Sequence, residues 1–251
     1  MNIVITNDDG IESPGLIVLK ETLEKEHDVW VIAPDGNRSG VSHSLTLRQP
    51  IKVVELTEKS YMCDGTPVDC IMIVHHKCIP VVPDIIISGI NIGPNLGSDI
   101  IFSGTIAAAR QASMFGCPSL AVSVNTFDEP YHLKKPSLFV RNNLDVFIEK
   151  WNSSHFLNIN FPNVEQLGEN IELTYPVKLP YSTEITNFRA PDGAVYNFYN
   201  GSIKGRPRDD GSDWSAVTRG SISICPINTY QTRYSETELY SPEMFSADFT
   251  Y

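Results

Sequence analysis

Two adjacent carboxylates, Asp8 and Asp9, follow a short apolar run at residues 3–5 that predicts a buried strand. Because neighbouring like charges repel each other, we expect a positive group beside them. A hydroxyl and an amide side chain, Ser39 and Asn91, follow two further strand-like runs. Carboxylate, hydroxyl and amide oxygens are the ligands that Mg²⁺, Mn²⁺ and Ca²⁺ prefer. Each segment alone is also typical of an ordinary turn, but three such segments together favour a divalent-metal site.

The segment Ser103-Gly104-Thr105 is a second candidate for binding chemistry, because it opens a helical pattern with small residues. Free backbone N–H groups at a helix N-terminus bind phosphate through hydrogen bonds and the helix dipole. A plain serine N-cap, which needs no ligand, is the alternative interpretation. His43 lies near the Ser39 segment. We interpret it either as a proton donor or substrate contact, or as a loop histidine without such a role.

The elements that must position these residues follow from an alternation of apolar runs and helical patterns. Strands are predicted at residues 3–5, 29–33, 84–88, 120–124 and 156–161, and helices at 14–25, 103–115 and 138–150. This alternation predicts an α/β fold with a mostly parallel sheet covered by helices on both faces. In such sheets ligands bind at the carboxyl ends of the strands, which is where the polar segments lie.

Beyond residue 175 the chain changes to short Tyr-, Thr-, Ser- and Gly-rich segments. We therefore expect a core domain at 1–175 and a β-rich appendage at 176–251. Residues 201–212 are predicted to form a surface loop. The run of residues 209–213 is interpreted as a solvated turn in preference to a second metal loop. His75 and His76 follow an apolar stretch, and neighbours on a strand point to opposite faces, so both are interpreted as structural or surface residues.

The overall composition excludes several classes of protein. The 251 residues carry a formal net charge of −11, which argues against binding a nucleic acid polymer, because such binding needs a basic surface. The five cysteines contain no Cys-x-x-Cys pair and are expected to be free thiols in a reducing compartment. The sequence shows no signal-peptide pattern and no apolar run long enough to span a membrane, so we expect a cytoplasmic protein that does not bind membranes.

Several motifs occur in a characteristic order along the whole chain and become sparse after about residue 165. They are Asn7-Asp8-Asp9-Gly10-Ile11, Pro14-Gly15, Ala33-Pro34-Asp35, Asn37-Arg38-Ser39-Gly40, His43-Ser44-Leu45-Thr46, Gly65-Thr66-Pro67-Val68-Asp69-Cys70, Ser88-Gly89-Ile90-Asn91, Gly93, Asn95-Leu96-Gly97, Ser103-Gly104-Thr105, Leu157-Asn158-Ile159-Asn160-Phe161-Pro162 and Asp213-Trp214. This ordered set resembles the SurE (survival protein E) nucleotidase family.

The resemblance implies a Rossmann-like core and a C-terminal arm whose exchange forms a homodimer or homotetramer. It also implies a divalent-metal nucleotidase that hydrolyses nucleoside 5′- and 3′-monophosphates and often short polyphosphate. The family's metal ligands correspond to Asp8, Asp9, Ser39 and Asn91 here. Its phosphate contacts correspond to Asn95, Ser103, Gly104 and Thr105. In hydrolysis by a metal-activated water, we expect Asp8 or Asp9 to orient that water and accept its proton. A sparse apolar and aromatic series after Ser221 independently favours an interface.

The end of the chain departs from the family pattern, because Tyr230 stands where an Asp is usual and Tyr234 where some members have His. This departure keeps open an alternative, a nucleotide-sensing module that binds without turnover. A second alternative is a phosphatase that forms an aspartyl-phosphate, which needs two carboxylates separated by one residue. The carboxylates here are adjacent, which favours direct attack by water.

Overall fold

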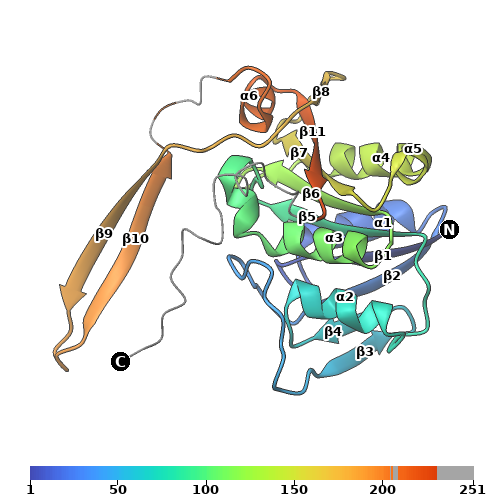
Figure 1. Ribbon diagram of the computed structural model, residues 1–251, viewed down its shortest axis with the longest axis horizontal. Coiled ribbons are helices and arrows are strands. Elements are labelled where there is room, and N and C mark those ends of the chain that lie inside the picture. Colours follow the sequence, from blue (N-terminus) through green and yellow to red (C-terminus); the bar gives the residue numbers. More distant parts are fainter. Residues whose placement is uncertain (204, 206–208, 231–251) are drawn as a thin grey trace, which may run out of the picture.

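The main feature of the molecule is a nine-stranded sheet in the order β3-β4-β2-β1-β5-β6-β7-β11-β8, seen in a computed structural model that describes residues 1–203, 205 and 209–230 (Figure 1). The strands are β1 (Asn2–Thr6), β2 (Asp28–Pro34), β3 (Val53–Thr57), β4 (Ser60–Cys63), β5 (Ile85–Ile92), β6 (Ser119–Asn125), β7 (His155–Pro162), β8 (Ile171–Leu173) and β11 (Ile222–Asn228). Strands from β4 through β7 pair in parallel, whereas β3 is antiparallel to β4 and β11 to β7. The prediction of a mostly parallel α/β fold is confirmed.

Helices cover both faces of this sheet (Figure 1). They are α1 (Pro14–Leu23), α2 (Pro67–His75), α3 (Gly104–Met114), α4 (Lys134–Asn142), α5 (Leu144–Lys150), α6 (Asp213–Thr218) and the 3₁₀ helix η1 (Gly97–Ile101). Side chains of β1 alternate between the two resulting cores: Ile3 and Ile5 pack with α1, α4 and α5, and Val4 packs with α2 and α3. None of the helices within the described residues is long and apolar enough to cross a membrane.

Two serines begin the helices that lie nearest the predicted site. The Ser13 side chain accepts a hydrogen bond from the N–H of Leu16, and Pro14 occupies the first turn, so α1 starts where the sequence predicts. The Ser103 side chain accepts from the N–H of Ile106 in the same way at the start of α3. Both caps fix the direction in which the preceding loops enter their helices.

Two predicted elements differ from the structure. The helix predicted at 138–150 is interrupted between α4 and α5, because the Asn143 side chain donates a hydrogen bond to the Phe139 carbonyl and Asn143 leaves helical geometry. The apolar stretch before His75 and His76 is the helix α2 instead of a strand, because Thr66 caps it through a capping box with Asp69. His75 ends α2 and stacks on Phe115, with 3.7 Å between the ring centroids.

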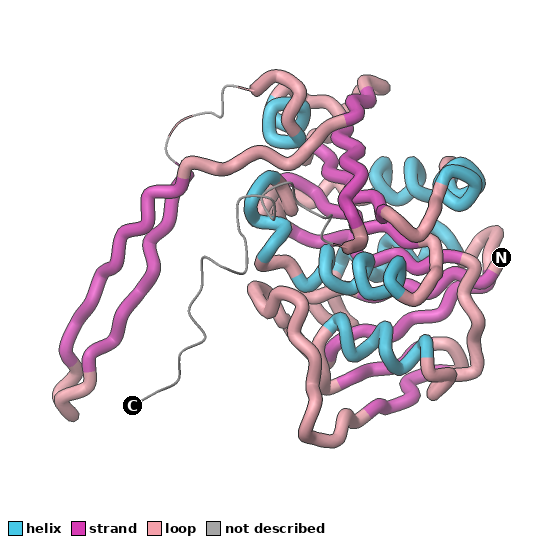
Figure 2. The backbone as a smooth tube through the Cα atoms, viewed as in Figure 1, coloured by secondary structure: helices cyan, strands magenta, loops and turns pink. Residues whose placement is uncertain are grey.

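The chain beyond residue 175 contributes to two separate sheets. Within the described residues, strands β9 (Tyr181–Arg189) and β10 (Val195–Ile203) pair only with each other. They form a long hairpin that stands away from the main sheet (Figure 2). The predicted loop at 201–212 therefore begins with three residues of a strand, because the hairpin ladder extends to Ile203. After the hairpin, β11 returns to the main sheet between β7 and β8.

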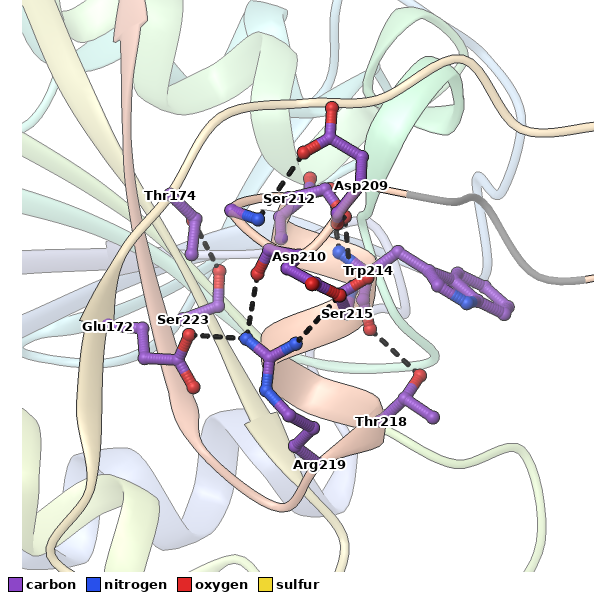
Figure 3. A network of polar contacts seen from close by, with 12 residues as sticks. Glu172, Thr174, Asp209, Asp210, Ser212, Trp214, Ser215, Thr218, Arg219 and Ser223 are labelled. Atoms are coloured by element: carbon purple, nitrogen blue, oxygen red, sulfur yellow. Dashed lines mark hydrogen bonds and ion pairs between the residues drawn. The ribbon is translucent and has the colours of Figure 1, made fainter.

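A polar network holds the chain together where it returns from the hairpin (Figure 3). The Arg219 guanidinium contacts the Glu172 carboxylate at 2.6 Å and the carbonyl of Asp210 at 2.8 Å. The hydroxyls of Thr174 and Ser223 lie 2.8 Å apart between β8 and β11. In the turn at 209–213, Asp210 and Gly211 are exposed, whereas Ser212 and Asp213 are buried, so only the first part of the predicted solvated turn is solvated.

Candidate active site

The carboxyl ends of β1, β2 and β5 bring the predicted polar segments to one edge of the sheet. A cavity of about 200 Å³ at this edge is lined by five of the predicted residues, Asp8, Ser39, Asn91, Asn95 and Ser103. The neighbouring cavity of about 630 Å³ is lined by Asp9 and also by Ser39. Asp8 and Asp9 therefore face adjoining spaces on either side of Ser39. Gly104, Thr105 and His43 line neither cavity.

Asp8 is fixed by the start of helix α3. The Thr105 hydroxyl donates to one Asp8 carboxylate oxygen at 2.5 Å, and the Thr105 N–H donates to the other at 3.1 Å. Burial, with 4% of Asp8 exposed, raises its pKa, and the hydrogen bonds from Thr105 and Gly104 oppose that rise. A Cβ atom at Gly104 would lie 2.9 Å from that of Asp8, so this approach requires glycine.

Asp9 is held less tightly than its neighbour. One of its carboxylate oxygens accepts a hydrogen bond of 3.0 Å from the N–H of Ile92, at the end of β5. Burial raises the pKa of Asp9 to about 6, and the nearby charge of Asp8 adds to that rise. Among the residues lining either cavity in the described chain there is no Lys or Arg to offset the two carboxylates. An added cation would relieve this unfavourable pair.

The hydrogen bonds of the other two candidate ligands leave oxygen atoms available. The Asn91 amide nitrogen donates to the Gly93 carbonyl at 2.7 Å, so its side-chain oxygen is the free atom. The Ser39 hydroxyl donates to the Asn37 side-chain oxygen at 2.5 Å, so the lone pairs on Ser39 Oγ are free. A hydroxyl and an amide oxygen beside two carboxylates form a set of oxygen donors that suits a hard divalent cation.

Metal sites built from three or more His, Cys, Asp or Glu side chains are absent from the part of the chain that the structure describes. A metal at this edge would therefore depend on two carboxylates plus neutral oxygens. The donor types fit Mg²⁺, Mn²⁺ or Ca²⁺ better than Zn²⁺, which favours nitrogen and sulfur ligands.

The predicted phosphate contacts separate into two groups. Asn95 and Ser103 line the cavity, and the Ser103 hydroxyl accepts from Ile106, which leaves its proton available to a ligand. Asn95 is held by backbone and side-chain hydrogen bonds to Ser123 of β6 and to Asn158 and Asn160 of β7. Gly104 and Thr105 lie behind Asp8, where their donors bind its carboxylate.

His43 lies to the side of these cavities. Its Nε2 atom is 2.8 Å from the Gln111 side-chain oxygen on α3, and Gln111 is buried. This contact attaches the loop after β2 to α3, and it accords with the interpretation of His43 as a loop histidine.

Sequence reasoning missed the structural role of Asp213, which it placed in a solvated turn. Asp213 is fully buried at the start of α6, and one carboxylate oxygen accepts a hydrogen bond of 2.7 Å from the N–H of Gly97. The other oxygen accepts from the Trp214 N–H at 2.8 Å. Burial raises the pKa of Asp213, and these donors oppose the rise. The signal that could have indicated this role was the Asp213-Trp214 motif, which belongs to the ordered set noted in the sequence. The composition of the turn alone does not reveal it.

Comparisons with known proteins agree with this arrangement. Residues 3–183 match the family model described as Survival protein SurE. The chain is 37% identical to the 5′-nucleotidase SurE of Geobacter sulfurreducens, covering 95% of this chain and 92% of that protein. It is 36% identical to the 5′-nucleotidase SurE of Pelobacter propionicus, covering 98% and 100%. A crystal structure of the SurE protein from Aquifex aeolicus superimposes with a TM-score of 0.84 at 31% identity, covering 95% of this chain and 98% of that one. The chain therefore belongs to the survival protein SurE family.

Proposed function

We propose that the chain is a divalent-metal-dependent phosphomonoesterase that hydrolyses nucleoside 5′-monophosphates to nucleoside and phosphate. The observation that carries the proposal is the pair Asp8 and Asp9, which share one sheet edge with the oxygens of Ser39 and Asn91. Among the described residues that line the cavities beside this pair there is no Lys or Arg. The names of the relatives from Geobacter sulfurreducens and Pelobacter propionicus supply the substrate class.

The proposal assigns a role to each side chain at this edge. Asp8, Asp9, Ser39 and Asn91 hold the cation, which would offset the charge of a phosphate oxygen and acidify a water. Asp9 has a carboxylate oxygen beyond the one that binds Ile92, and this oxygen orients the attacking water. Ser103 and Asn95 face the cavity and position the phosphate oxygens. Thr105 and Gly104 position Asp8, and they act on the phosphate only through that carboxylate.

The finer substrate range belongs to the same proposal. Nucleoside 3′-monophosphates and short polyphosphate present the same terminal phosphate to Asn95 and Ser103, so they are candidate additional substrates. The bound ion is Mg²⁺, Mn²⁺ or Ca²⁺, because these three share the preference for oxygen ligands. A cytoplasmic location accords with five free cysteines, three of which are buried, because cytosolic thiols stay reduced.

The deciding assay is release of phosphate from AMP with added Mn²⁺, with and without a chelator. We expect release that chelation stops and excess Mn²⁺ restores. Turnover that continues in chelator, or that survives in Asp8→Asn, would contradict the metal assignment. Binding of AMP without release of phosphate would instead identify a nucleotide-sensing module, for which the departure at Tyr230 is the motive.

We also propose a homodimer or homotetramer formed through the region 176–251. The β9–β10 hairpin carries exposed apolar side chains, including Tyr181, Ile185, Phe188, Tyr196, Phe198 and Tyr199. A two-stranded hairpin is marginally stable alone, so burial against a second copy would stabilise it. Tyr234 and the rest of 231–251 lie outside the described residues. Light scattering of the full chain and of a chain truncated after Tyr230 tests the proposal: a monomeric full chain refutes it, and a smaller assembly after truncation locates the exchange in 231–251.

A further inference from the structure

We propose that the nucleoside of the substrate occupies the cavity of about 630 Å³ beside the metal-binding edge, with its base stacked on Phe127. We further propose that the carboxylates of Glu12 and Glu129 in this cavity disfavour nucleoside diphosphates relative to nucleoside monophosphates. The inference rests on the proposed phosphatase function and adds to it a binding place for the leaving group.

The two cavities share three lining residues, Ser39, Ile92 and Phe127. The smaller cavity is lined by the side chains assigned to the metal and the phosphate except Asp9, which lines the larger cavity beside Ser39. A phosphate placed against Asp8 and Ser103 therefore has the larger cavity as an adjoining space for its substituent. The larger cavity also has the size typical of small-molecule sites.

Phe127 has the features of a stacking platform. Its side chain is 75% exposed, although it follows the buried strand β6. A Cβ atom at Gly93 would lie 2.6 Å from a carbon of the Phe127 ring, so the ring rests directly on the backbone of that glycine. The ring is thus packed against the backbone of Gly93 and exposed to the cavity. An exposed aromatic ring beside a phosphate site binds a base by stacking, whatever the base.

Phe102 is the competing platform, because it is 61% exposed and lines the smaller cavity. It does not line the larger one. A base on Phe102 would leave the larger cavity without a role, whereas a base on Phe127 uses both cavities.

The charges of the larger cavity suit a neutral group. Glu12 and Glu129 form no ion pair with any residue that the structure describes. Asp35 also lines the cavity, but Arg38 pairs with it at 2.5 Å. A nucleoside presents hydroxyl and N–H donors that carboxylates accept, whereas a second phosphate would face unpaired negative charge. This difference favours nucleoside monophosphates over nucleoside diphosphates.

The test compares kcat/KM for AMP with kcat/KM for ribose 5-phosphate, which lacks the base. We expect the AMP to ribose 5-phosphate ratio to fall about 10-fold in Phe127→Ala, since alanine substitution of a stacking ring weakens base binding by about that factor. Phe127→Tyr keeps a ring and should retain the ratio. Phe102→Ala is the matched control and should change both substrates alike. A ratio unchanged in Phe127→Ala, or lowered by Phe102→Ala instead, overturns the assignment.

The proposed role of the Glu12 and Glu129 carboxylates is tested by comparing kcat/KM for ADP with kcat/KM for AMP at matched free Mn²⁺. The double variant Glu12→Gln/Glu129→Gln should raise the ADP to AMP ratio about 10-fold, because it removes two repulsive charges. The double variant Glu55→Gln/Glu58→Gln makes the same change of net charge on exposed residues outside the cavity and should leave the ratio unchanged. If the two double variants have equal ADP to AMP ratios, Glu12 and Glu129 do not disfavour nucleoside diphosphates.

Failure of the proposed function is recognised separately. If the wild-type protein releases phosphate from neither AMP nor ribose 5-phosphate, the phosphatase proposal fails. The same ratios, measured as dissociation constants by calorimetry with Mn²⁺ present, then decide whether Phe127 binds the base.

Discussion

Replacing Asp9 by Asn should abolish catalysis and, in metal-free protein, raise stability. The Asn side-chain oxygen can still accept the hydrogen bond from the N–H of Ile92, so the loop keeps its anchor. The substitution removes the negative charge of Asp9, which lies beside the charge of Asp8. The described residues that line the two cavities include no Lys or Arg to offset these charges. The substitution therefore separates the metal-binding role of Asp9 from its effect on folding.

The magnitude follows from the pKa of Asp9, which folding raises from its ordinary value of 3.8 to about 6. A shift of about two units corresponds to roughly 3 kcal/mol at neutral pH, which we reduce to about 2 kcal/mol because Asp9 retains some contact with solvent. For a chain of this length that gain raises Tm by roughly 4–8 °C. The loss of a metal ligand should lower kcat/KM for AMP by about 100-fold or more.

The sign of the pH dependence is fixed by the direction of the shift. The folded protein binds the Asp9 proton more tightly than the unfolded chain, so metal-free wild-type protein loses stability as the pH rises from about 4 to about 6. The gain in Asp9→Asn should therefore be present at pH 7 and vanish below about pH 4. Saturating Mn²⁺ should reduce or reverse it, because the metal stabilises wild-type protein by about 2.7 kcal/mol at 100 times its Kd.

Thermal unfolding in chelator at pH 7 and pH 4, and again with Mn²⁺, measures these differences. The exposed residue Asp128 provides a matched control, because Asp128→Asn makes the same change of net charge outside the cavities. A variant no more stable than wild type at pH 7, or a gain that persists unchanged at pH 4, would refute the reasoning. A similar gain in Asp128→Asn would show that net charge alone is responsible.

Four further outcomes are expected. Thr105→Val keeps the side-chain volume but loses the hydroxyl that binds Asp8, so calorimetry should show a Kd for Mn²⁺ raised about 10-fold, with Thr105→Ser near wild type. Gly104→Ala places a methyl group 2.9 Å from the Asp8 Cβ, so it should displace the Asp8 carboxylate and lower kcat/KM for AMP. An unchanged kcat/KM would contradict the role assigned to Gly104. Asp213→Ala leaves the N–H of Gly97 without its partner and should lower the free energy of unfolding by about 2–4 kcal/mol in denaturant titration, whereas Asp213→Asn retains an acceptor. Acid-quenched enzyme incubated with AMP should show no phosphoryl adduct by mass spectrometry, and an adduct on Asp8 would overturn direct attack by water.

The convergence of the polar segments at one sheet edge was predictable because parallel strands place their carboxyl ends together. Once residues 3–5, 29–33 and 84–88 are assigned to one parallel sheet, Asp8, Ser39 and Asn91 must lie near one another. Local sequence carries no comparable information on β11, whose place between β7 and β8 depends on long-range pairing.

The start of α3 shows the other limit of sequence reasoning. Ser103-Gly104-Thr105 predicts a helix start with backbone amides that attract an anion, and α3 does begin at this segment. Whether the anion is a phosphate or a side chain depends on the distance to β1, which no local pattern encodes. In the structure the donors of Thr105 bind the Asp8 carboxylate, which the sequence pattern did not indicate.

The base of the β9–β10 hairpin makes this protein a natural insertion scaffold. The N–H of Asp213 donates to the Tyr175 carbonyl at 3.0 Å, and Tyr175 forms an isolated bridge with Ser212, so the segments that lead to and from the hairpin meet at the main body. The hairpin also contacts η1, where the Tyr181 hydroxyl donates a hydrogen bond to the Asp99 carboxylate. The hairpin forms no ladder with the nine-stranded sheet within the described chain (Figure 1). Its length and surface can therefore change during evolution without shifting the register of the strands that carry Asp8, Asp9 and Asn91. For protein engineering, the turn at residues 191–193 between β9 and β10 is a position where a foreign binding loop can be displayed.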